Sequence, residues 1–131
     1  MNQSEPNLKI HNEERSIQIF NIVFKMDEIV PMVKHIVMWK LKAFAEGKNK
    51  EENILVLKEK LEKLKTVLPE IRHLELGVNF NSSDQAYDVV LYSEFKNRKD
   101  LELYQKHPEH QEVAEFVGKI RSERKVVDYE Y

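Results

Sequence analysis

The sequence predicts an α+β domain in which helices cover one face of a single antiparallel sheet. Three observations support this class. Segments with period-two alternation of apolar residues are interleaved with segments whose apolar residues step by three and four. Capping and turn-forming residues separate these segments. The chain of 131 residues, 41% hydrophobic and 34% charged, has the size and composition of one globular domain with a substantial core.

The first predicted strand runs from Val33 to Lys42. Alternation places five side chains on one of its faces: Val33, His35, Val37, Trp39 and Leu41. The other face carries Ile36 and Met38 between lysines. Because both faces hold apolar residues, we expect both to be at least partly covered. The residues that follow, 43–49, are predicted to form a loop.

The clearest predicted helix follows this loop. One apolar stripe is spaced by three and four residues and comprises Ile54, Leu57, Leu61, Leu64 and Leu68. Asn49 is a plausible N-cap, and Glu51 and Glu52 suit the positive end of the helix dipole. Pro69 prevents the helix from continuing beyond Leu68.

Two further strands are predicted in the middle of the chain. The first runs from Ile71 to Phe80 and the second from Tyr87 to Phe95, each with alternating apolar residues. The sequence Asn-Ser-Ser-Asp at 81–84 is typical of a turn. The two strands are therefore expected to be neighbours joined by a polar connection.

The last part of the chain predicts two helices and a closing strand. Asn97 caps a short helix that carries Tyr104, and Pro108 suits the first position of a helix reaching about Ile120. Lys125 to Tyr131 is predicted as the final strand. The resulting β-α-β-β-α-β order is the ferredoxin-like arrangement, with an antiparallel sheet and helices on one face.

The opposite face of such a sheet is uncovered in a monomer. Four apolar or aromatic residues are expected there: Ile36, Met38, Val90 and Tyr92. Exposed apolar patches of this kind mark interaction sites. The sequence therefore predicts a homodimer in which two sheets pack face to face.

Residues 1–31 are predicted to be an N-terminal extension of a domain that spans 32–131. Met32 stands directly before the first strand and is interpreted as an alternative start of the native domain. Ile17 to Phe24 is an apolar stretch that needs a surface to cover it. It could add a strand or a helix to the domain, or mediate association, and the sequence leaves these alternatives open.

Composition and charge argue against several classes of protein. The formal net charge of −2 and the pI of about 6.2 lack the basic character of a nucleic-acid-binding protein. No stretch approaches the roughly 20 apolar residues that span a bilayer. The chain has no cysteine and three isolated glycines, which excludes thiol chemistry and glycine-rich phosphate loops. We expect a cytoplasmic protein without a secretory signal.

Three residues are predicted to converge on one apolar cavity between the sheet and the helices. His110 is the candidate general acid/base, because an imidazole exchanges protons near neutral pH. Tyr104 is its candidate partner, able to orient or polarise a carbonyl oxygen. His35 adds a further polar group on the first strand. The predicted ligand-binding residues are His35, Val37, Trp39, Leu91, His107 and Val113.

Simpler interpretations of these residues compete with the catalytic one. A buried histidine is more often a structural hydrogen-bonding residue than a catalytic one. His107 stands directly before Pro108, which suggests an N-cap residue. His107, Glu109 and His110 form only a weak metal-ligand pattern, so we predict neither a metal nor another cofactor.

Three segments resemble the stress-responsive A/B barrel domain (Dabb) family. They are Val33–Lys42, Asp100–His110 and Val126–Tyr129, and the likeness covers Met32 to Tyr131. The resemblance implies a dimeric α+β barrel with a ferredoxin-like fold. It implies less about activity, because most members look like small proteins of unassigned biochemistry, some of them linked to stress responses.

The resemblance also suggests roles for individual residues. In olivetolic acid cyclase, a plant member that closes a polyketide by aldol condensation, the acid/base histidine and its tyrosine match His110 and Tyr104, and a pocket histidine matches His35. A second strand histidine of that enzyme falls at Val89, which departs from its pattern. Aromatic residues of its pocket wall fall near Leu57, Lys58 and Leu61, so the wall differs too.

Two functional hypotheses follow from the sequence. The first is a dimeric, stress-responsive domain that binds a small apolar ligand without turning it over. The alternative is a cofactor-free lyase, cyclase or monooxygenase-like enzyme that uses His110 with Tyr104. The sequence favours the first, because it contains no strong catalytic signature.

Overall fold

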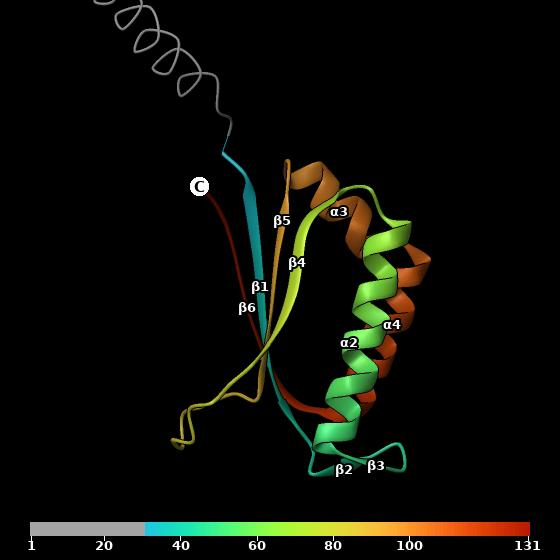
Figure 1. The fold of residues 1–131 in the computed structure, drawn as a ribbon. Helices are drawn as coiled ribbons and strands as arrows, with labels where there is room; N and C mark the ends of the chain where they lie inside the picture. Colours follow the sequence, from blue (N-terminus) through green and yellow to red (C-terminus); the bar gives the residue numbers. More distant parts are fainter. Residues whose placement is uncertain (1–30) are drawn as a thin grey trace, which may run out of the picture. The chain divides into compact units, whose positions relative to one another are not determined.

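The structure, a computed structural model, describes residues 31–131. Within this range a four-stranded antiparallel sheet has the order β4-β5-β1-β6 (Figure 1). Its strands are β1 (Val33–Leu41), β4 (Ile71–Val78), β5 (Val89–Phe95) and β6 (Arg121–Glu130). The helices are α2 (Lys50–Val67), α3 (Arg98–Lys106) and α4 (Pro108–Ile120), and α2 and α4 lie on one side of the sheet (Figure 1). This arrangement confirms the predicted ferredoxin-like fold.

The predictions for the start of the chain, including the apolar stretch Ile17 to Phe24, lie outside the described residues. Within the described part, no helix is long and apolar enough to cross a membrane.

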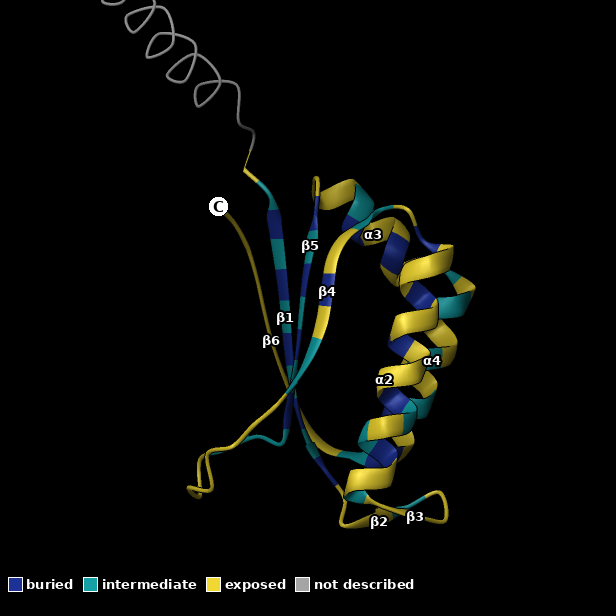
Figure 2. Ribbon diagram, viewed as in Figure 1, coloured by how far each residue is buried: buried dark blue, intermediate teal, exposed yellow. Residues whose placement is uncertain are grey.

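Alternation along β1 separates a buried face from a partly exposed face (Figure 2). Val33, His35, Val37, Trp39 and Leu41 are buried under the helices, as predicted. The residues between them are half-buried on the open face of the sheet. Strand β5 repeats the pattern, since its pairing with β1 sets Leu91 opposite Val37.

Helix α2 begins at the residue that the sequence indicates. The Asn49 side chain accepts a hydrogen bond from the Glu52 backbone at 2.8 Å, and the Glu52 carboxylate accepts one from the Asn49 backbone at 3.1 Å. This capping box satisfies backbone donors that have no partner inside the helix. The predicted stripe then packs on the sheet, with Leu57, Leu61 and Leu64 fully buried.

The segment predicted as a loop contains a short hairpin, β2 (Phe44–Ala45) and β3 (Lys48–Asn49). Glu46 and Gly47 between them both have positive φ, 53° and 74°, which is the backbone of a tight two-residue hairpin turn. The buried Asn53 amide donates to the carbonyls of Ala45 at 3.0 Å and Lys48 at 3.4 Å. These bonds attach the hairpin to α2.

Three strand boundaries differ from the predictions by two residues or more, and the ends of β1 and β6 differ by one residue. Strand β4 ends at Val78 rather than Phe80, and β5 begins at Val89 rather than Tyr87. Between them the Asn79 side chain donates to the Tyr87 carbonyl at 2.7 Å, which replaces regular strand pairing with a local contact. Strand β6 begins at Arg121, four residues before the predicted Lys125. That stretch lacks apolar alternation, but its backbone pairs with β1 along the sheet edge.

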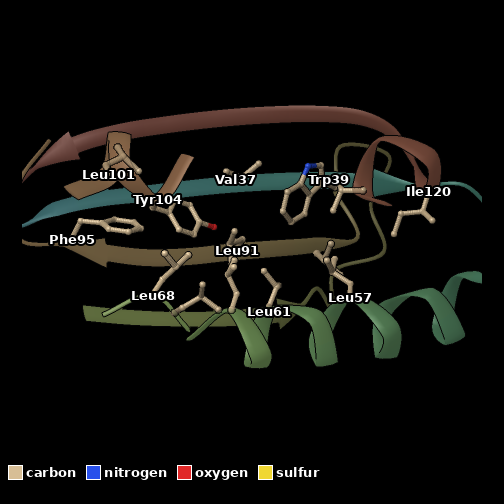
Figure 3. Packing of buried hydrophobic residues seen from close by; sticks show 14 of the residues in the cluster. Val37, Trp39, Leu57, Leu61, Leu68, Leu91, Phe95, Leu101, Tyr104 and Ile120 are labelled. Carbon is tan, nitrogen blue, oxygen red and sulfur yellow. The ribbon is translucent and has the colours of Figure 1, made fainter. Parts of the chain in front are cut away.

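The core lies between the sheet and the helices (Figure 3). Phe95 and Tyr104 pack against each other with ring centroids 4.9 Å apart. Leu68 lies opposite them, and Leu61 and Leu57 follow along α2 toward Trp39 on β1 (Figure 3). The helices cover β1, β4 and β5, so the residues of β6 stay largely exposed (Figure 2). The edge strand therefore borders the core without being buried in it.

Candidate functional site

A cavity of about 170 Å³ lies between the covered face of the sheet and helix α4. Four of the predicted apolar residues line it: Val37, Trp39, Leu91 and Val113. The three predicted polar residues, His35, Tyr104 and His110, line it as well. Strands β1 and β5 and helices α3 and α4 thus bring together residues that are far apart in sequence.

Tyr104 is fully buried on α3, and its ring contacts both predicted histidines. The ring centroids are 4.3 Å from His110 and 6.3 Å from His35. The hydroxyl is buried and has no hydrogen-bond partner among the described residues. Burial raises the pKa of the phenol, because the phenolate would lose its hydration. Tyr104 therefore stays protonated at neutral pH and can donate a hydrogen bond.

His110 lies in the first turn of α4 and is held in one tautomer. Its Nδ1 is 3.1 Å from the Gln105 carbonyl oxygen. A carbonyl only accepts hydrogen bonds, so Nδ1 carries the proton and Nε2 of the neutral ring keeps a free electron pair. Burial lowers the pKa of His110, and the positive charge of Arg124 acts in the same direction. The ring is therefore neutral near pH 7 and can act as a base.

His35 is buried on β1 at 3% exposure, and its Nδ1 lies against the Asp128 carboxylate. Asp128 is opposite His35 in the pairing of β1 with β6. A carboxylate accepts a hydrogen bond from the Nδ1–H group and so orients the ring. The sequence alone does not mark Asp128 as the partner of this histidine, because the pairing depends on the register of β6.

His107, predicted to bind ligand, does not line the cavity. It is the N-cap of α4, and its Nδ1 accepts a hydrogen bond from the Glu109 backbone at 3.1 Å. Pro108 at the first helical position explains this, since the preceding residue is extended and its side chain can reach the first free N–H groups. The structure thus places His107 in the structural role that the sequence offered as an alternative.

Five residues that line the cavity were not predicted to do so, and two of them are charged, Arg121 and Arg124. Both belong to the start of β6, ahead of Lys125, where the sequence predicted the strand to begin. In the register, Arg124 is opposite Trp39 and Arg121 is opposite Leu41, which brings both to the covered face. A polar stretch with no alternation gives no signal of this placement. The start of β6 becomes evident only from its backbone pairing with β1.

The described residues lack a cluster of side chains suited to a metal ion. Within residues 31–131, no group of three histidine, cysteine, aspartate or glutamate side chains is placed to hold a metal ion. His107, Glu109 and His110, the pattern considered in the sequence, do not form such a group. The prediction of a metal-free and cofactor-free site stays a prediction.

Comparison with known protein families identifies the domain. The model of the stress-responsive A/B barrel domain matches residues 33–131. The chain belongs to this family. The resemblance seen in the sequence is thereby confirmed. A comparison with curated proteins found no match.

Solved structures share the fold of this A/B barrel domain. A Bacteroides fragilis protein, described as dimeric, of unknown function and ferredoxin-like, is 37% identical over 76% of this chain and 96% of its own, with a TM-score of 0.63. An Arabidopsis thaliana protein is 25% identical over 74% and 92% of the two chains, with a TM-score of 0.61. A hydroxynitrile lyase from Passiflora edulis is 19% identical over 76% and 93%, with a TM-score of 0.65. At that identity the likeness to the lyase concerns the fold alone.

Proposed function

We propose that this A/B barrel domain binds a small, largely apolar molecule in the cavity between sheet and helices. The observation that carries the proposal is the buried Tyr104 hydroxyl, which borders the cavity and has no hydrogen-bond partner among the described residues. A buried unsatisfied polar group is destabilising, so its presence favours a role that a ligand completes. The apolar walls, including Val37 and Leu91, suit a hydrocarbon body.

Ring-sized ligands test this proposal. An engineered apolar cavity of roughly 150 Å³ admits benzene, so a cavity of about 170 Å³ is large enough for one substituted ring. We expect toluene, benzyl alcohol or benzoate to raise the melting temperature of the full chain. Val113→Phe fills the cavity and should abolish the shift. Val67→Phe, at an exposed position outside the cavity, is the matched control and should retain it. Absence of any shift in the unmodified protein would refute the proposal.

We also propose that the domain is a homodimer through the open face of the sheet. Ile36, Met38, Val90 and Tyr92 are all half-buried on this face. The connection between β4 and β5 carries Phe80, which is 98% exposed, and Phe80 shares a surface hollow with Met38 and Val90. The 37% identical Bacteroides relative is described as dimeric. A second copy would cover this apolar surface, and sedimentation equilibrium would measure the assembly.

A second candidate function is acid–base catalysis, favoured by the fixed tautomer of His110. A neutral Nε2 could take a proton from a carbon next to a carbonyl group. The Tyr104 hydroxyl could donate a hydrogen bond to the oxygen where negative charge develops. The proton moves to the imidazole and the electron pair moves to the carbonyl oxygen, so the step needs no other reactant.

Deuterium exchange tests this candidate. Acetophenone in D₂O should exchange its methyl protons faster with the protein than without it. His110→Ala should lose about 10²–10⁴-fold of the protein-dependent rate. His73→Ala removes an exposed histidine of β4 that is not at the cavity and should leave the rate unchanged. Equal rates for the two variants would rule out His110 as the base.

A further inference from the structure

The polar groups around the cavity include two cationic side chains from the edge strand. Arg121 and Arg124 line the cavity, and neither forms an ion pair with another described residue. Each guanidinium is planar and charged at every physiological pH, and it matches the two oxygens of a carboxylate. Neither charge is neutralised within the described part of the chain.

A buried donor without a partner lies at the same end of the cavity. Trp39 Nε1 is buried and has no hydrogen-bond partner among residues 31–131. An indole N–H can only donate, so it needs an acceptor. Trp39 is opposite Arg124 in the register, and Figure 3 shows its nitrogen at the ring edge nearest the red-brown ribbon of β6. The donor and the arginines therefore belong to one end of the cavity.

No acidic side chain balances these donors. None of the residues that line the cavity is an aspartate or a glutamate. The acids of the neighbouring part of β6 are already paired, Asp128 with His35 and Glu130 with Arg98. The cavity thus offers cations and an unsatisfied N–H at one end, and apolar walls in its middle. An anionic oxygen group on an apolar body complements both parts.

We propose that the ligand of this cavity is a small carboxylic acid bound as its anion, a class represented by benzoate. This inference rests on the proposed ligand-binding function. The carboxylate lies between the guanidinium groups of Arg121 and Arg124 and accepts the Trp39 N–H. The ring or short chain lies against Val37 and Leu91. The volume limits the body to one ring.

Three ligands with the same ring and different charges test the proposal. They are benzoate, benzyl alcohol and benzylamine, titrated into the ¹⁵N-labelled full chain at pH 7 with dissociation constants taken from amide shifts. We expect benzoate to bind at least tenfold more tightly than benzyl alcohol, and benzylamine to bind most weakly. Raising the salt concentration should weaken benzoate selectively, because part of its affinity is between charges.

Substitutions assign the effect to the arginines. Arg124→Gln should weaken benzoate at least tenfold and leave benzyl alcohol unchanged, because hydrogen bonds to charged groups are worth more than neutral ones. Arg121→Gln should act in the same direction. Arg72→Gln is the matched control, since it removes the same charge from an exposed position away from the cavity. Arg124 is exposed on an edge strand, so its replacement should preserve the fold.

The outcomes separate this proposal from the one on which it rests. Equal affinities for benzoate and benzyl alcohol, unaffected by Arg124→Gln, would overturn the anion assignment and leave an apolar binding site. Failure of all three ligands to bind would overturn both proposals. Weakening of benzoate by Arg72→Gln as strong as that by Arg124→Gln would show a general charge effect, and would also overturn the assignment.

Discussion

Adjacent residues of β1 face two different environments. Val37 and Trp39 are 2% and 6% exposed beneath the helices, whereas Ile36 and Met38 remain half-buried on the open face. The covered face is completed within one chain, by the leucine stripe of α2 and by Tyr104 of α3. The open face has no such cover within the described residues. The contrast shows that one face stabilises the fold within a single chain, and it supports the proposal that the other face packs against a second copy.

The two faces also differ in how they treat polar groups. On the open face, Lys34 pairs with Glu94 at 3.0 Å, and Glu94 also accepts a hydrogen bond from Tyr92 at 3.0 Å. These groups satisfy one another next to solvent. On the covered face His35 is paired with Asp128, but the Trp39 N–H and the Tyr104 hydroxyl have no partner among residues 31–131. Both of these groups border the cavity, so a ligand bound there can use them.

The largest expected effect is a loss of stability caused by a substitution on the covered face. Phe95→Ala removes a fully buried ring and should lower the free energy of unfolding by about 3–5 kcal/mol. Urea unfolding measures it, and the loss should be the same at every protein concentration. Phe95→Leu keeps most of the volume and should lose much less. Equal losses for the two variants would contradict the dependence on packing.

The next largest expected effect is a loss of dimer affinity caused by a substitution on the open face. Met38→Glu places a charge in the proposed dimer interface twice, once from each copy, and should weaken the dimer at least a hundredfold, about 2.8 kcal/mol. Analytical ultracentrifugation should show a folded monomer. Gln111→Glu adds the same charge on an exposed part of α4 and should leave the dimer intact. A Met38→Glu protein that remains dimeric would place the interface elsewhere.

Replacing Tyr104 should have a smaller effect, a gain in stability rather than a loss. Tyr104→Phe removes a buried hydroxyl that has no partner within residues 31–131, so the variant should be as stable as the parent or more stable, by about 1 kcal/mol. Thermal unfolding without ligand measures this. A clear loss of stability would show that the hydroxyl is satisfied in solution, and would weaken the case for a ligand there.

The smallest expected effect is a change of stability with pH that arises from His110. Its pKa in the folded protein is lowered from 6.5, so below pH 6.5 the unfolded chain binds a proton that the folded chain does not. Stability should therefore fall as the pH drops through 6.5 toward the folded pKa. His110→Gln should reduce this part of the slope in urea midpoints measured between pH 7 and 5. An unchanged slope would show that the ring is not held neutral.

The sequence predicted the parts of the fold that depend on local pattern. The cap at Asn49, the stripe from Ile54 to Leu68 and the alternation of β1 follow from helix capping and side-chain periodicity, and the structure confirms them. The start of β6 could not be found this way. Residues Arg121 to Lys125 carry no alternation, since an edge strand that the helices do not cover need not bury one face.

The site, like the fold, contains residues that local pattern predicts and residues that it does not. Tyr104, His110 and His35 could be grouped in advance because each falls on the inward face of a predicted element. Asp128 and Arg124 could not be grouped with them, because only the register of β6 against β1 decides which residues come opposite His35 and Trp39. A register is set by long-range backbone pairing, and shifting it by one residue would turn every side chain of β6 to the other face.

By itself, the sequence therefore determined the fold class, most of the elements and the residues that meet at the centre of the cavity. The tertiary structure decided what surrounds them. It placed the Asp128 carboxylate against His35, and it brought to the cavity two arginines that have no ion-pair partner in the described part of the chain. It also made His107 the N-cap of α4 rather than a cavity residue. The physical reason is the range of the forces involved. Propensity, capping and periodicity act within a few residues, whereas the charge lining a cavity depends on strands that meet only when the chain has folded.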